Sequence, residues 1–282
     1  MCYQPIQIEN PKFGMVGQER YLLVNCRKCL ECRQKRANEW ALRCMAEAQK
    51  YQQNCFLTLT YEKSPFFLNK RDLQLFLKRL RKAIYPHKIK YFACGEYGSK
   101  NYRPHFHLII FGYDFEDKYL WSRSGRNHVI YRSNKLETIW KFGYCTVQEV
   151  TTNSCAYCAL YSSPQKHEMP KLLQAYPEFN LMSKNLGTDF LLSNMEKYLL
   201  TDEVYHDGKK YNIPQYILNK YFGDIGKLID DRYLELKRKR KIKYDLSLDW
   251  RKDYTEKELW ETPYDQRKYL RENAKKRLTK TI

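Results

Sequence analysis

The chain has 282 residues, of which 51 are Lys or Arg and 32 are Asp or Glu, giving a formal net charge of +19. This excess attracts polyanions, and the 25 Tyr, 13 Phe and 5 Trp suit stacking on unpaired bases, so we expect nucleic acid as the partner. A continuous apolar run of membrane length and a secretory signal are both absent, which excludes an integral membrane protein and favours an intracellular one. In a reducing compartment the ten cysteines would stay free or bind metal.

The N-terminal region, residues 1–52, combines a cysteine cluster with a helix. Cys26, Cys29 and Cys32 recur every third residue, and Cys2 would supply a fourth thiol to a tetrahedral structural Zn²⁺ site. The alternative is a chance grouping of free thiols. The helix is predicted from apolar residues at helical spacing, namely Ala37, Trp40, Ala41, Cys44, Met45 and Ala48.

The central region, residues 53–165, alternates strand and helix patterns. Thr and aromatic residues at period two predict strands, and apolar residues at 73, 76, 77, 80 and 84 predict a helix that ends before Pro86. This order predicts an α+β fold, an antiparallel sheet with helices on its faces. In chain order the predicted elements are a strand at 55–61, the helix, strands at 89–98 and 105–112, a helix at 134–142, a strand at 143–150 and a helix from 151 or 152.

The remainder divides at about residue 230. Residues 166–229 continue the domain, with helical or mixed segments at 194–200 and 214–222 and a turn at Gly208. Residues 230–282 form a basic, charged extension for which we expect helix. The run of five cations at 237–241 is typical of a solvated helix face, and specific DNA contact is the alternative.

The most informative motif for chemistry is His105-Phe106-His107 in the strand at 105–112. Side chains two apart on a strand share a face, so the two imidazoles can hold one ion and leave positions open for water and phosphate oxygens. Glu96 lies on the preceding strand, and a hairpin would bring it across from the histidines as a third ligand. Two imidazoles with one carboxylate suit Mn²⁺ and accept Mg²⁺. The alternative is an ordinary exposed pair of histidines.

Two tyrosines supply a candidate nucleophile. Tyr157 and Tyr161 are four residues apart, which places both phenols on one face of a helix. A tyrosine oxygen can attack a phosphodiester and conserve its bond energy in a phosphotyrosine. Without the histidines, packing would explain the pair equally well. Cys158 has no histidine partner nearby in sequence, and we discount it as a nucleophile.

Taken together, these motifs resemble those of HUH rolling-circle replication initiators, in particular those of Microviridae, the small single-stranded DNA phages, in the gokushovirus group. The resemblance covers most of residues 1–222 and extends to the cysteine cluster, Glu39-Trp40 and the segment Met182-Ser-Lys-Asn-Leu-Gly187. Its successive motifs are Cys-Phe-Leu-Thr-Leu-Thr-Tyr (55–61), Gly-Glu-Tyr-Gly (95–98), Arg-Pro-His-Phe-His (103–107) and Tyr-x-x-x-Tyr (157–161).

The resemblance implies a sheet like that of the RNA-recognition or ferredoxin-like fold, a metal at Glu96, His105 and His107, and nucleophiles at the two tyrosines. It further implies nicking of single-stranded DNA at the phage origin, a 5′-phosphotyrosine link and a 3′-hydroxyl that primes the host replication machinery in the bacterial cytoplasm. The family has a basic residue three positions after the first tyrosine, where this chain has Leu160. Arg103 and Lys166 are therefore the candidate DNA-binding cations, with Lys166 as the substitute.

Three alternatives fit part of the pattern. A plasmid relaxase or a transposase would share the metal and tyrosine chemistry and differ in its DNA target. A non-catalytic single-stranded DNA-binding protein would explain the charge and the aromatic residues but not the convergence of two imidazoles and a carboxylate. A capsid-associated DNA binder would depend on the basic extension and not on His105.

Overall fold

The computed structural model describes Cys2, residues 5–10, Gly14, and residues 20–98, 101–124, 128–160 and 170–248. The chain forms two compact units, one of residues 36–217 and one that combines residues 1–35 with residues 218–282. These boundaries differ from the four regions that the sequence pattern suggests, and that division remains a prediction. Among the described residues, no helix combines the length and the apolar character needed to cross a membrane.

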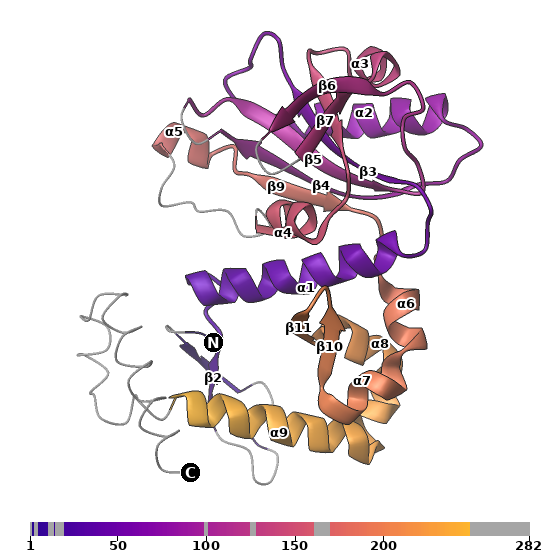
Figure 1. Cartoon of the computed structure of the whole chain (residues 1–282). Coiled ribbons are helices and arrows are strands. Elements are labelled where there is room, and N and C mark those ends of the chain that lie inside the picture. Colours follow the sequence, from indigo (N-terminus) through magenta and orange to yellow (C-terminus); the bar gives the residue numbers. More distant parts are fainter. Residues whose placement is uncertain are drawn as a thin grey trace. The chain divides into compact units, whose positions relative to one another are not determined.

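A seven-stranded antiparallel sheet forms the centre of the larger unit (Figure 1). This is the α+β architecture predicted from the sequence. The strand order is β6-β7-β8-β3-β5-β4-β9. The strands are β3 (Asn54–Thr60), β4 (Lys90–Tyr97), β5 (Pro104–Phe111), β6 (Tyr119–Ser124), β7 (His128–Arg132), β8 (Cys145–Gln148) and β9 (Phe179–Met182).

Helices cover both faces of this sheet, because alternate residues of β3, β4 and β5 are apolar on each side. One face packs on α2 (Lys70–Ala83) and α3 (Asn134–Trp140). The other packs on α1 (Leu30–Ala48) and α4 (Thr152–Leu160). Figure 1 shows α2 and α4 on opposite sides of the strands. Helix α2 begins at its cap Asn69, whose side chain accepts from the N–H of Arg71 at 3.0 Å, and buries Leu73, Phe76, Leu77 and Leu80.

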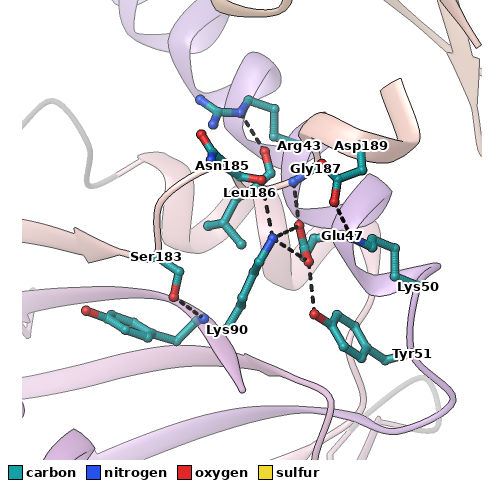
Figure 2. Close-up of polar contacts among 11 residues, drawn as sticks. Arg43, Glu47, Lys50, Tyr51, Lys90, Ser183, Asn185, Leu186, Gly187 and Asp189 are labelled. Carbon is teal, nitrogen blue, oxygen red and sulfur yellow. Dashed lines mark hydrogen bonds and ion pairs between the residues drawn. The ribbon is translucent and has the colours of Figure 1, made fainter. Parts of the chain in front are cut away.

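Glu47 of α1 holds the segment after β9 against the larger unit (Figure 2). Its carboxylate is fully buried and accepts from the backbone N–H of Gly187 at 2.7 Å, from Tyr51 at 3.2 Å and from Lys90 at 3.1 Å. One turn earlier, Arg43 donates from Nε to the carbonyl of Leu186 at 3.0 Å. A buried carboxylate is tolerated only with such partners, so this network fixes the Met182-Ser-Lys-Asn-Leu-Gly187 segment on α1.

Gly187 is required by both its conformation and its surroundings, and Gly187→Ala is expected to lower the free energy of unfolding by about 3 kcal/mol. Its φ is +65°, and an added Cβ would lie 2.3 Å from the carbonyl oxygen of Arg43. Gly208→Ala is the matched control, because Gly208 has φ +66° with nothing within 4 Å of the added Cβ, and it should cost only about 1 kcal/mol. Chemical denaturation of both full-length variants measures the difference, and equal losses would contradict the steric argument.

Short helices and a hairpin complete the larger unit. The hairpin of β10 (Glu203–His206) and β11 (Lys209–Asn212) turns at Asp207-Gly208, where both φ angles are positive, as the sequence predicted for Gly208. The helices are α5 (Lys171–Gln174), α6 (Thr188–Ser193), α7 (Met195–Thr201) and the start of α8 (Gln215–Ile229), which breaks at Gly223.

The smaller unit contains a ribbon of β1 (Ile6–Glu9) and β2 (Tyr21–Val24), most of α8, and α9 (Asp231–Leu248). Phe222 and Tyr233 pack with ring centroids 5.0 Å apart. Helix α9 agrees with the helix expected after residue 230, and residues 249–282 lie outside the described residues. Lys237, Arg238, Lys239 and Lys241 are exposed and Arg240 is half-buried, so this run forms a solvated helix face.

Candidate active site

Glu96, His105 and His107 converge at one end of the sheet. In the β4–β5 register Glu96 lies opposite His105, and Cys94 lies opposite His107, so the three side chains share one face. That face is the one on which α1 and α4 pack, whereas Phe106, Leu108 and Ile110 point into the core on the other face. One ligand atom from each of the three lies within 4.8 Å of the other two.

The contacts within this group centre on one carboxylate oxygen. Oε1 of Glu96 lies 2.6 Å from Nε2 of His105 and 3.3 Å from Nε2 of His107, the latter outside hydrogen-bond geometry. The second nitrogen of each ring is held in place, since Nδ1 of His105 lies 3.0 Å from the carbonyl of Arg103 and Nδ1 of His107 lies 3.0 Å from Oγ1 of Thr58. Both Nε2 atoms therefore face the carboxylate.

Burial and pairing set the charges here. Burial opposes ionisation of Glu96, but the interactions with His105 and His107 outweigh it and lower the pKa of the carboxyl to about 2. Burial lowers the pKa of His107, which favours a neutral ring at neutral pH. For His105, burial is outweighed by the hydrogen bond to Glu96, and its pKa is raised. An anionic carboxylate and a neutral imidazole are the states that bind metal ions.

Tyr157 reaches the group from α4. Cys155, Cys158 and Ala159 occupy the buried face of that helix and are small enough for close packing on the sheet. Tyr157, on the adjacent face, donates its hydroxyl to Oε1 of Glu96 at 2.8 Å, and its ring stands edge-on to His107 at 5.1 Å. The helix start is fixed by reciprocal hydrogen bonds between Thr151 and Ser154.

A groove of about 750 Å³ opens beside Tyr157 and His107. It runs over the face that carries Phe56 and Thr58 and is lined by polar side chains that include Gln148 and Asn153. Amides, hydroxyls and an aromatic face are the groups that bind a base or a sugar. The groove thus gives an extended ligand direct access to the phenol and the imidazole.

The remaining predicted site residues lie elsewhere. Arg103 donates from its guanidinium to the carbonyl oxygens of Tyr61 and Glu62, so it braces the loop after β3. Tyr161 and Lys166 lie outside the described residues. Cys2, Cys26, Cys29 and Cys32 come together in the smaller unit, and Cys158 is buried in the sheet core.

Sequence reasoning missed Thr58. The alternation in Cys-Phe-Leu-Thr-Leu-Thr places Thr58 and Thr60 on one face of β3, but only the pairing of β3 with β5 sets Thr58 opposite His107. A prediction of strand order would have found it. Periodicity alone does not give the order of strands in a sheet.

An antiparallel sheet with a carboxylate, two imidazoles and a tyrosine hydroxyl at one end agrees with the fold of HUH replication initiators. The model of a family described as replication-associated protein ORF2 matches residues 54–166, which include β3, the three metal-ligand candidates and Tyr157. That segment belongs to this family, and the chain as a whole is related to the replication-associated proteins of small phages.

Two curated relatives extend the similarity beyond the matched segment. Replication-associated protein ORF4 of Chlamydia phage 1 is 34% identical over 234 residues, covering 76% of this chain and 58% of the relative. Replication-associated protein ORF2 of Spiroplasma virus 4 is 29% identical over 250 residues, covering 76% of this chain and 78% of the relative.

A third relative is shorter in its match. Replication-associated protein VP4 of Bdellovibrio phage phiMH2K is 32% identical over 148 residues, which cover 49% of this chain and 47% of the relative. The chain thus spans about half to three quarters of the length of these relatives. No solved structure was found to match it significantly.

Proposed function

We propose that the chain is a rolling-circle replication initiator that nicks single-stranded DNA at a phage origin with Tyr157. The observation that carries the proposal is the hydroxyl of Tyr157 on the same Glu96 oxygen that His105 contacts. A phenol packed for structure alone has no reason to meet a carboxylate flanked by two imidazoles. The names of the three relatives support a role in phage DNA replication.

Glu96, His105 and His107 would hold Mg²⁺ or Mn²⁺. Among the described residues, Oε2 of Glu96 and Nε2 of His107 are buried without a hydrogen-bond partner, which costs free energy unless a ligand meets them. One carboxylate and two imidazoles are a donor set that suits Mn²⁺ and accepts Mg²⁺. When bound, the ion would polarise the scissile phosphate and stabilise the charge that develops on it.

The protein's own part in the reaction is a transesterification. The hydroxyl oxygen of Tyr157 attacks phosphorus, the bond from phosphorus to the 3′-oxygen breaks, and a 5′-phosphotyrosine forms. The phenol loses one proton and the departing 3′-oxygen gains one, so no water is consumed and the reverse reaction rejoins the strand. Glu96 positions the hydroxyl through Oε1, and Thr58 orients His107.

The groove beside the site would hold the nucleotides next to the scissile bond. Its polar lining suits unpaired bases, and the net charge of +19 attracts the DNA backbone. The free 3′-hydroxyl would then prime the host polymerase. Tyr161 would serve as a second nucleophile for rejoining, and Lys166 as the cation that replaces the basic residue missing at Leu160.

The test is a nicking assay with the full chain and single-stranded oligonucleotides tiled across the phage origin. We expect cleavage in Mn²⁺ or Mg²⁺, none in EDTA, a protein–DNA adduct that survives boiling in detergent, and a 3′ end that a polymerase extends. Binding without cleavage would overturn the proposal in favour of a non-catalytic single-stranded DNA-binding protein. Cleavage confined to non-phage sequences would indicate a relaxase or a transposase.

A further inference from the structure

Four cysteines of the smaller unit meet although they come from separate parts of the chain. Cys2 lies near the N-terminus, Cys26 follows β2, Cys29 directly precedes α1, and Cys32 lies in its first turn. One sulfur from each lies within 4.8 Å of the other three. All four are free thiols, and Cys2 and Cys29 are buried, with exposed fractions of 2% and 8%.

The spacing of the sulfur atoms fits a tetrahedral metal site better than a disulfide. A tetrahedron with Zn–S bonds of about 2.3 Å has edges of about 3.8 Å. The sulfur atoms of Cys2 and Cys29 are 3.8 Å apart, far beyond the roughly 2.05 Å of a disulfide bond. Four thiolates are soft donors that select Zn²⁺ over Mg²⁺ or Mn²⁺.

The local backbone stabilises thiolates. The N–H of Cys26 donates to the sulfur of Cys2 at 3.2 Å, and the N–H of Cys29 donates to the sulfur of Cys26 at 3.3 Å. Such hydrogen bonds favour a charged sulfur over a neutral thiol, which accepts weakly. Four thiolates around Zn²⁺ carry a net charge of −2, and Arg27 and Lys28, between two of the ligands, help to offset it.

The neighbouring ribbon has little else to hold it. The large apolar side chains of β1 and β2 are exposed, with fractions of 41% for Ile6, 38% for Ile8, 47% for Tyr21 and 43% for Leu23. A two-stranded ribbon without an apolar core is marginal in water, and small units of this kind usually need a metal or a disulfide. The buried sulfur cluster lies where such a link would tie residue 2 to the start of α1.

We propose that Cys2, Cys26, Cys29 and Cys32 form a closed, structural Zn²⁺ site that fixes the N-terminal ribbon to the start of α1. With four protein ligands the ion has no open position, so the site is structural and separate from the centre at Glu96 and His107. The proposal does not depend on the nicking chemistry, and either can fail without the other.

Metal analysis of the full chain, purified without chelators, tests the site. We expect about one zinc per chain in wild type and less than about a fifth of that in Cys29→Ser. Cys145→Ser, a buried cysteine of β8 outside the cluster, and His107→Ala, in the other centre, should both keep the zinc. Wild type without zinc, or Cys29→Ser with a full equivalent, would overturn the proposal.

Co²⁺ substitution decides the matter if Cys29→Ser does not fold. Wild-type chain freed of zinc under reducing conditions should bind Co²⁺ with a thiolate-to-cobalt charge-transfer band and the strong visible absorption of a tetrahedral complex. Cys26→His should keep a tetrahedral spectrum with a weaker charge-transfer band, because imidazole can replace one thiolate. Absence of the band in wild type would show that the four thiols bind no such ion.

Discussion

Tyr157→Phe is expected to abolish the protein–DNA adduct and to slow nicking at least about a thousand-fold. The substitution removes one oxygen and leaves the ring, so the edge-on contact with His107 and the packing of α4 are preserved. What is lost is the hydroxyl on Glu96, which is the proposed attacking atom. The assay is single-turnover cleavage of origin DNA in Mn²⁺, with the adduct counted after boiling in detergent.

Two further variants make the result specific. Tyr144→Phe is the control, because Tyr144 is exposed at 54% and lies outside the groove, and it should nick like wild type. Tyr161→Phe separates first cleavage from rejoining: we expect it to nick once and to fail in closing the strand. An adduct that persists in the Tyr157→Phe, Tyr161→Phe double variant would show that the nucleophile has been misassigned.

His107→Ala is expected to lower Mn²⁺ affinity and to slow nicking by about a hundred-fold or more, while single-stranded DNA still binds. His107 is buried, its pKa is lowered by burial, and its Nε2 faces Glu96. The neutral ring therefore offers a lone pair where the carboxylate offers a charge. Titration calorimetry with Mn²⁺ and single-turnover nicking measure the two losses independently.

A graded variant tests the orientation of the ring. Thr58→Val removes the hydroxyl at Nδ1 of His107 and keeps the shape of the side chain, and a loss of about ten- to a hundred-fold in metal affinity is expected. Thr146→Val, on β8 directly opposite Thr58, is the control and should change neither quantity. Metal-dependent nicking at the wild-type rate in His107→Ala would rule out the metal centre proposed for Glu96, His105 and His107.

The main strands and helices of the larger unit follow from local pattern. Period-two alternation predicted β3, β4 and β5 to within about a residue, because each strand is apolar on a face that must be buried. The same alternation placed His105 and His107 on one side. By contrast, β6, with Ser122, Arg123 and Ser124 among its six residues, has no such alternation, and the β6–β7 hairpin was not predicted.

Local pattern was enough to identify the residues that carry chemistry: two imidazoles on one strand face, a carboxylate on the preceding strand, a tyrosine on a following helix and a row of cysteines. How these residues meet depends on the folded chain. Tyr157 and Glu96 are 61 residues apart, and their contact requires α4 to pack its small residues against β4 and β5. Thr58 reaches His107 only because β5 lies between β3 and β4. Local periodicity fixes the face of each element, whereas strand order and helix docking follow from burial of the whole core.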